Sequence, residues 1–187
     1  MSRGTLARAG LIITGAFLAS RVLGWLRVVV LGNLFGAGAE LDAYYAAFRI
    51  PDLIFELVAA GAITSALIPV LSGLIEHGER DRAWRVASTV LNLMLAVLLT
   101  LAVLLFFLAP TLVPWLVPGL DEATTALTVE LTRLMLISPI LLAAGSIITA
   151  ILETQNRFAP SALAPVVYNT SIIVGALLLE PAMGIHG

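Results

Sequence analysis

The sequence predicts an all-α protein, a polytopic bundle that crosses a membrane about five times with its N-terminus inside the cell. Hydrophobic residues make up 60% of the chain, charged residues only 12%, and the mean hydropathy is +1.04, which lies outside the range of soluble domains. Five apolar stretches are long enough to cross about 30 Å of hydrocarbon. We expect one membrane domain over 1–187, with spans at 8–32, 42–72, 86–109, 124–151 and 160–180.

The first span carries two arginines, Arg21 and Arg27, with Gly24 between them. Its apolar pattern continues beyond Ser20, which favours a retained helix over a cleavable signal peptide. A glycine at membrane depth lets a neighbouring backbone or a ligand approach closely. We therefore expect Gly24 to be a hinge or a close-packing position.

The second span, predicted as one helix from Asp42 to Leu71, carries four charges in its first half. On a helical wheel the four fall within about 80° of one another and form one stripe. If each faced lipid near the bilayer centre, insertion would cost roughly 10 kcal/mol in total. The stripe must therefore face protein, water or substrate. Its members are Asp42, Arg49, Asp52 and Glu56.

Pro51 lies in the same predicted helix, between Arg49 and Asp52 in the sequence. Proline removes one backbone hydrogen bond and kinks a helix or opens it. At membrane depth such irregular backbone borders a cavity or a moving joint. We expect Pro51 to be a hinge.

The later spans carry few polar residues. In the fourth, Glu130 and Arg133 are three residues apart, a spacing that favours an intrahelical pair. In the fifth, we expect Asn169 and Thr170 to bond each other or a neighbouring backbone. The mixed-charge run at 76–85 is predicted to be a solvated link between two spans.

The orientation follows from the arginines, because cytoplasmic loops retain positive residues. The N-terminus and the second and fourth connections hold six arginines, whereas the first, third and C-terminal connections hold none. The N-terminus is therefore predicted to be inside and the C-terminus outside. The six are Arg3, Arg8, Arg80, Arg82, Arg85 and Arg157.

Several function classes lack their signals. The chain has no cysteine, its net charge is −2 and its arginines are scattered, so thiol chemistry and a nucleic-acid footprint are missing. There is no phosphate-cradling loop with lysine, no H-E-x-x-H and no aspartate-rich metal cluster. We expect no catalytic residue, no metal, no cofactor and no nucleic-acid partner; the partners are lipids or membrane proteins.

Two interpretations of the membrane-depth charges stay open. Three arginines and three acids in the first two spans could neutralise one another, which would need no substrate. Against this, Arg21 and Arg27 are about 120° apart on their helix, so both cannot easily pair with one narrow stripe. Intramembrane charges often mark pathways, and arginine binds phosphate through a bidentate fork. We favour an anionic lipid headgroup such as a pyrophosphate, with the acids orienting arginines or taking up a proton or sodium ion.

Four segments carry a resemblance to a known family: SRVLGWLR at 20–27, FGAGAELDAYYAAFRIPDL at 35–53, GAITSALIPVL at 61–71 and ETQNRFAPSALAPVVYNTSIIVGA at 153–176. Together they resemble the MurJ/MviN family of lipid II flippases, a multi-pass family of the bacterial cytoplasmic (inner) membrane. The resemblance implies a two-lobed transporter that turns lipid-linked peptidoglycan precursor to the outer leaflet by alternating access, for cell-wall synthesis. This chain would supply an incomplete N-terminal lobe.

The resemblance also implies roles for single residues. Arg21, Arg27 and Asp42 match positions regarded as required in the cavity, and Arg49 matches a basic position. We therefore assign substrate binding to Arg21, Arg27 and Arg49. Gating or ion coupling falls to Asp42, Asp52 and Glu56. Gly61, with Ala62, matches a small pair and joins Gly24 and Pro51 as a hinge or close-packing position. Coupling to the membrane potential, a proton or sodium stays open.

The chain departs from the family pattern at two places. Phe55 and Glu56 stand where an arginine pair is common, and Ala60 stands where an acid is common. The changes at Phe55 and Glu56 favour an alternative cargo, another polyprenyl-linked sugar or a cation-coupled drug. A further alternative is an interaction protein that transports nothing. Family members have about fourteen helices, so rocking one repeat against another would need a C-terminal lobe or a second chain.

Overall fold

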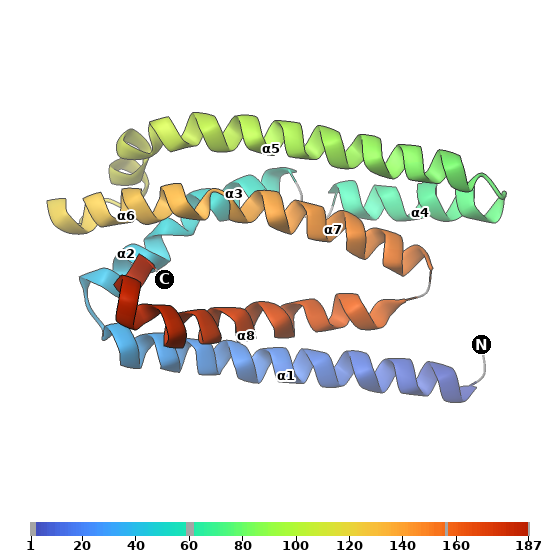
Figure 1. Ribbon diagram of the computed structural model, residues 1–187, viewed down its shortest axis with the longest axis horizontal. Helices are drawn as coiled ribbons and strands as arrows, with labels where there is room; N and C mark the ends of the chain where they lie inside the picture. The colour runs from blue at the N-terminus through green and yellow to red at the C-terminus, as the bar shows by residue number, and fades with distance from the viewer. Residues whose placement is uncertain (1–2, 59–61, 156, 187) are drawn as a thin grey trace. The chain divides into compact units, whose positions relative to one another are not determined.

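The computed structural model describes the backbone of residues 3–58, 62–155 and 157–186. Side chains are described for these residues except 3–9, 12 and 57–65. Every secondary-structure element in the described part of the chain is a helix (Figure 1). The chain divides into two compact units. Unit 1 consists of Met1–Leu41 and Asn156–Gly187, and unit 2 of Asp42–Gln155. The all-α prediction is confirmed, and the expected single membrane domain stays a prediction.

Unit 1 is a pair of long helices that lie side by side, α1 (Arg3–Phe35) and α8 (Phe158–Met183), followed by the short 3-10 helix η1 (Gly184–His186) (Figure 1). Both long helices are apolar over most of their length, as the first and fifth predicted spans require. Most of their large side chains are exposed, among them Leu18 and Leu178. Such surfaces are compatible with lipid contact, since lipid tails are as apolar as leucine.

The second predicted span is not one helix. The structure divides it into α2 (Ala39–Ala47), α3 (Arg49–Val58) and α4 (Ala62–Glu76). Pro51 accounts for the first break, because a proline cannot donate to the carbonyl four residues earlier, which here is that of Ala47. Helix α2 ends at that residue. The prediction of a kink beside Arg49 is confirmed, and the prediction of one continuous helix is wrong.

Unit 2 is completed by α5 (Arg80–Leu116), α6 (Glu122–Met135) and α7 (Ser138–Thr154). Helix α5 contains the third predicted span and is longer than it at both ends. The fourth predicted span is interrupted at 136–137, just before Pro139. Four segments of the described chain are long and apolar enough to cross a membrane. They are Ile13–Phe35, Arg80–Leu116, Glu122–Thr154 and Phe158–His186.

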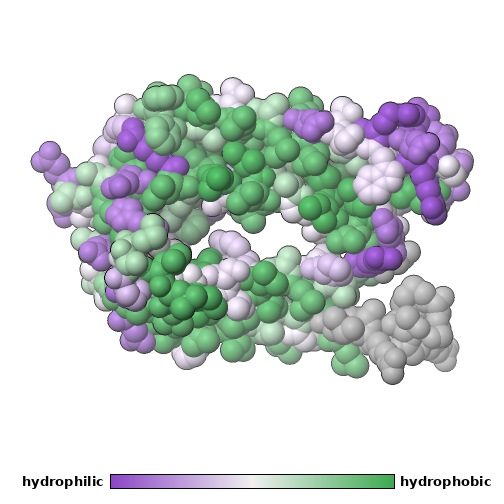
Figure 2. Space-filling model, in the orientation of Figure 1, coloured by the Kyte–Doolittle hydropathy of each residue, from purple (hydrophilic) through white to green (hydrophobic). Residues whose placement is uncertain are grey.

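The core of unit 2 joins α5 and α7 through small and branched side chains. Leu98, Ala109, Ala143 and Ile147 are at most 1% exposed, and these two helices contact each other directly. From Leu93 onward the outward-facing residues of α5 are mainly apolar, whereas hydrophilic side chains gather where α4 meets α5 (Figure 2). This distribution fits a helix that crosses lipid and ends in water.

Candidate functional site

Helix α3 is amphipathic and presents three charged side chains on one face. Arg49, Asp52 and Glu56 are exposed, whereas Ile50 and Ile54 are each 5% exposed and belong to the core of unit 2. The charges lie at positions i, i+3 and i+7, which share one face of an α-helix. The predicted stripe is therefore confirmed for these three residues.

Asp42 belongs to a different helix from the other three charges, because α2 ends before the break at Phe48. A helical wheel carries information only along a continuous helix, so the placement of Asp42 on the same wheel was wrong. Its side chain is exposed, and the buried face of α2 consists of Ala43, Ala46 and Ala47.

The charges on α3 do not neutralise one another by close pairing. Within the part of the chain that the structure describes, no ion pair within 4.0 Å joins Arg49 to Asp52 or to Glu56. On the topology predicted from the arginine distribution, helix α3 also lies midway along the segment 39–76, whose two ends would face opposite sides of the membrane. Three charges at that depth would cost roughly 9 kcal/mol against lipid. This face therefore requires water, substrate or further protein.

The two arginines of α1 differ in their surroundings. Arg21 is exposed. Arg27 is half-buried, and its guanidinium carbon lies 6.0 Å from the centre of the Tyr168 ring on α8. That distance is the outer limit of a cation–π contact, so the ring contributes weakly to holding Arg27 and leaves its donors available.

A polar contact between α1 and α8 lies beside Gly24. Asn169 is 8% exposed, and its side-chain amide donates to the Pro165 carbonyl at 2.9 Å and to the Ser20 hydroxyl at 3.5 Å. A β-carbon built on Gly24 would lie 3.8 Å from the Asn169 Oδ1 atom, an ordinary contact. The prediction that Asn169 bonds a neighbouring backbone is confirmed, and so is that for Thr170, whose hydroxyl donates to the Val166 carbonyl.

Sequence reasoning missed Ser20 and Tyr168 as neighbours of this site. Both are partners of residues far away in the chain, Asn169 and Arg27 respectively, and periodicity carries no information about such pairs. The polar dipeptide Tyr168–Asn169 inside an apolar span was the available signal.

The predicted site residues are divided between the two units. Arg21, Arg27 and Gly24 belong to unit 1, whereas Asp42 and the three charges of α3 belong to unit 2. Their assembly into one cavity stays a prediction. Gly61 lies outside the described residues.

Two cavities in unit 2 lie away from the predicted site residues. One, of about 220 Å³, is lined mainly by apolar residues of α4, α5 and α7 together with Arg80. The other, of about 640 Å³, is lined by residues of α5 and α6, among them Glu130 and Arg133. Among the described residues no group of three histidine, aspartate or glutamate side chains is placed to hold a metal ion.

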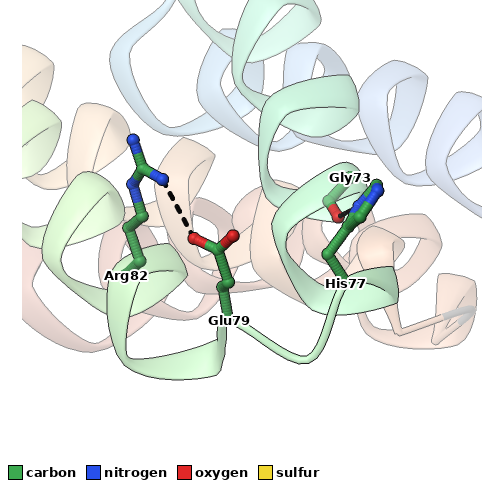
Figure 3. A network of polar contacts seen from close by, with 4 residues as sticks. All are labelled: Gly73, His77, Glu79 and Arg82. Atoms are coloured by element: carbon green, nitrogen blue, oxygen red, sulfur yellow. Dashed lines mark hydrogen bonds and ion pairs between the residues drawn. The ribbon is translucent and has the colours of Figure 1, made fainter.

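The mixed-charge connection between α4 and α5 is a solvated link, as predicted. Arg82 donates to the Glu79 carboxylate at 3.0 Å, and both side chains are largely exposed (Figure 3). His77 lies 2.7 Å through its Nδ1 atom from the Gly73 carbonyl one turn earlier (Figure 3). These local contacts close the turn and form no site.

Comparisons with known proteins agree on one family. Residues 31–187 match the family model described as lipid II flippase MurJ. The chain is 31% identical over 179 residues to the lipid II flippase MurJ of Burkholderia cenocepacia, covering 94% of this chain and 34% of that protein. It is 35% identical over 185 residues to the probable lipid II flippase MurJ of Vibrio cholerae, covering 94% and 35%.

The fold agrees as well. A solved structure of lipid II flippase MurJ in an inward closed conformation matches with a TM-score of 0.78 and 28% identity, covering 94% of this chain and 37% of that one. The chain thus spans about a third of the length of the proteins it matches.

Proposed function

This chain belongs to the MurJ family of lipid II flippases, and from that membership we propose that it forms part of a transporter that moves lipid II across the bacterial cytoplasmic membrane for peptidoglycan synthesis. The chain is a multi-pass membrane protein of transporter fold, and its family is named for transport rather than for an enzymatic reaction. The remaining lobe would come from a further part of the same protein or from a second chain.

The exposed charged face of α3 is the observation that carries the proposal. A face with one arginine and two acids at membrane depth is stable only against a polar partner. In a flippase that partner is a water-filled cavity and the headgroup that passes through it. The buried isoleucines on the opposite side of α3 fix this face in place.

We assign the pyrophosphate to the arginines and gating to the acids. Arg21, Arg27 and Arg49 would bind the diphosphate, because the guanidinium fork matches phosphate oxygens and stays charged when partly desolvated. Asp42, Asp52 and Glu56 would orient those arginines or take up a coupling proton or sodium ion.

Rescue of bacteria depleted of their own flippase tests the proposal. We expect the complete protein to restore growth and Arg49→Ala to abolish rescue at an unchanged membrane level. Arg82→Ala is the matched control, because Arg82 is also exposed but its partner Glu79 lies in the solvated connection. The proposed pyrophosphate site would be refuted if all three arginine variants still restored growth, namely Arg49→Ala, Arg21→Ala and Arg27→Ala.

A second cargo deserves a direct comparison because the net charge of the segment favours a cation. Between Asp42 and Glu56 there are three acids and one arginine, and the position of Glu56 is one where the family commonly has a basic residue. Competition between purified lipid II, another polyprenyl-linked sugar and a cationic drug decides the cargo. If the protein binds the cationic drug most tightly and Glu56→Gln abolishes that binding, the drug and not lipid II is the cargo. If the protein binds none of the three compounds, an interaction protein is favoured.

A further inference from the structure

Pro51 leaves one backbone carbonyl without its helical partner. In a continuous helix the amide of residue 51 would donate to the carbonyl of Ala47, but proline has no N–H. Ala47 is 0% exposed, so water cannot replace the missing donor. The hydroxyl of Thr132 on α6, itself 1% exposed, donates to this carbonyl at 3.4 Å.

Pro110 likewise leaves one backbone carbonyl without its helical donor, on the helix α5. The carbonyl that it leaves without an amide is that of Phe106 on α5. The Nε atom of Arg133 donates to this oxygen at 3.0 Å, and the guanidinium lies 4.8 Å from the centre of the Phe106 ring. The backbone bond and the ring contact together fix Arg133 on α5.

The two donors are adjacent residues in the last turn of α6. Each bonds a carbonyl that a proline has freed, one at the end of α2 and one in α5. Thr128, one turn earlier, shows the ordinary alternative: its buried hydroxyl donates to Thr124 of its own helix at 2.7 Å. Thr132 differs from Thr128 in that its hydroxyl donates to a carbonyl of another helix, the one freed by Pro51.

We propose that the last turn of α6 is a clamp, in which Thr132 and Arg133 act as positioning residues for two proline-interrupted helices. Thr132 holds the end of α2 and so sets where α3 begins, which places Arg49 and Asp52. Arg133 holds the same turn to α5. The inference rests on the proposed function only where it links this geometry to transport.

Spin-label distances test the clamp without any transport assay. This sequence contains no cysteine, so once any cysteine in the rest of the complete protein is replaced, Leu53→Cys on α3 and Leu134→Cys on α6, both at exposed positions, give one defined label pair. The pair is measured in the complete protein in lipid nanodiscs, alone and combined with Thr132→Val, Thr132→Ser or Thr128→Val. Valine removes the hydroxyl at nearly constant shape, and serine keeps it.

We expect Thr132→Val to broaden the distance distribution, and Thr132→Ser and Thr128→Val to leave it as in the labelled parent. Thr128 is the matched control because it is equally buried on the same helix. An unchanged distribution in Thr132→Val would overturn the proposal. Broadening in all three variants would also overturn it, since it would show a general loss of packing.

Arg133 gives a second arm. With labels at Val103→Cys on α5 and Leu134→Cys, Arg133→Met should broaden the distribution, and Arg133→Lys, which retains a cationic donor, should restore most of it. If the labelled parent, Arg133→Met and Arg133→Lys all give the same distance distribution, Arg133 does not position α5.

Transport then distinguishes the two proposals. An interhelical hydrogen bond in a bilayer is worth about 0.6 kcal/mol, so we expect Thr132→Val to slow lipid II movement about threefold and Thr132→Ser to recover it. If the parent protein moves no lipid II while the label distances respond as expected, the clamp stands and the proposed function fails. If transport occurs but the distances do not respond, the clamp fails alone.

Discussion

Gly24 offers a test of how closely α1 and α8 approach. It lies within the long helix α1, and an added β-carbon would meet a single heavy atom within 4 Å, the Asn169 Oδ1 atom at 3.8 Å. Glycine inside a helix costs about 0.5–1 kcal/mol relative to alanine. Gly24→Ala should therefore raise the free energy of unfolding by about that amount, with no steric loss to offset it.

Gly36 is the matched control in the connection that follows α1. Its φ angle is +69°, and a β-carbon there would meet nothing within 4 Å. The left-handed conformation costs a non-glycine residue about 1–2 kcal/mol, so Gly36→Ala should lower the free energy of unfolding although it creates no clash. Comparing Gly24→Ala with Gly36→Ala separates the effect of a steric contact on stability from the effect of backbone conformation.

Titration with sodium dodecyl sulfate in mixed micelles, followed by tryptophan fluorescence, measures both changes. Trp25 neighbours Gly24 and is largely exposed, so its emission reports on this part of α1. A loss of more than about 1 kcal/mol in Gly24→Ala would refute the reasoning, because it would mean that the two helices pack against the bare backbone. Of the two roles expected for Gly24, close packing would then be favoured over a hinge.

Three further predictions concern unit 2. Leu98 is fully buried, so Leu98→Ala should lower the free energy of unfolding by about 2 kcal/mol or more through the cavity it leaves, measured by the same titration. Arg82→Ala should change it by less than about 1 kcal/mol, because the Arg82–Glu79 pair is exposed and screened; a larger loss would show that the connection is structural. Asp121 caps α6 by accepting a hydrogen bond from the Thr124 amide at 2.8 Å, which lowers the pKa of that carboxyl. Its contribution is therefore present above the ordinary aspartate pKa of 3.8 and lost as the pH falls through the lower folded value. Asp121→Ala should flatten the decline of the unfolding midpoint in this acidic range, and an unchanged slope would contradict the assignment.

Hydropathy alone could predict most of the fold, because lipid imposes a simple rule on long helices. The first, third and fifth spans correspond to α1, α5 and α8, and the fourth to α6 with α7. The sequence also located the disturbance at Pro51. What it could not predict was whether proline would bend the helix or end it, since that depends on what bonds the Ala47 carbonyl. Here the answer is Thr132, which is 85 residues away.

The candidate site was less predictable for the same reason. Charge periodicity placed Arg49, Asp52 and Glu56 on one face correctly, because all three lie on the continuous helix α3. It misplaced Asp42 because the argument crossed a break. Contacts such as that of Arg27 with Tyr168 join opposite ends of the chain, and local patterns carry no record of them.

The separation of α2 from α3 changes what the charges can do. On one continuous helix, four charges would turn as a rigid stripe, so a substrate would meet all or none of them. With a break at Phe48, Arg49 and the acids of α3 can shift relative to Asp42 when the backbone at the joint rearranges. A transporter requires such a difference in binding between its two states, since a ligand shifts an equilibrium only by its differential affinity. The buried bond from Thr132 holds the end of α2 in place while α3 moves, so its loss is expected to slow the change of state.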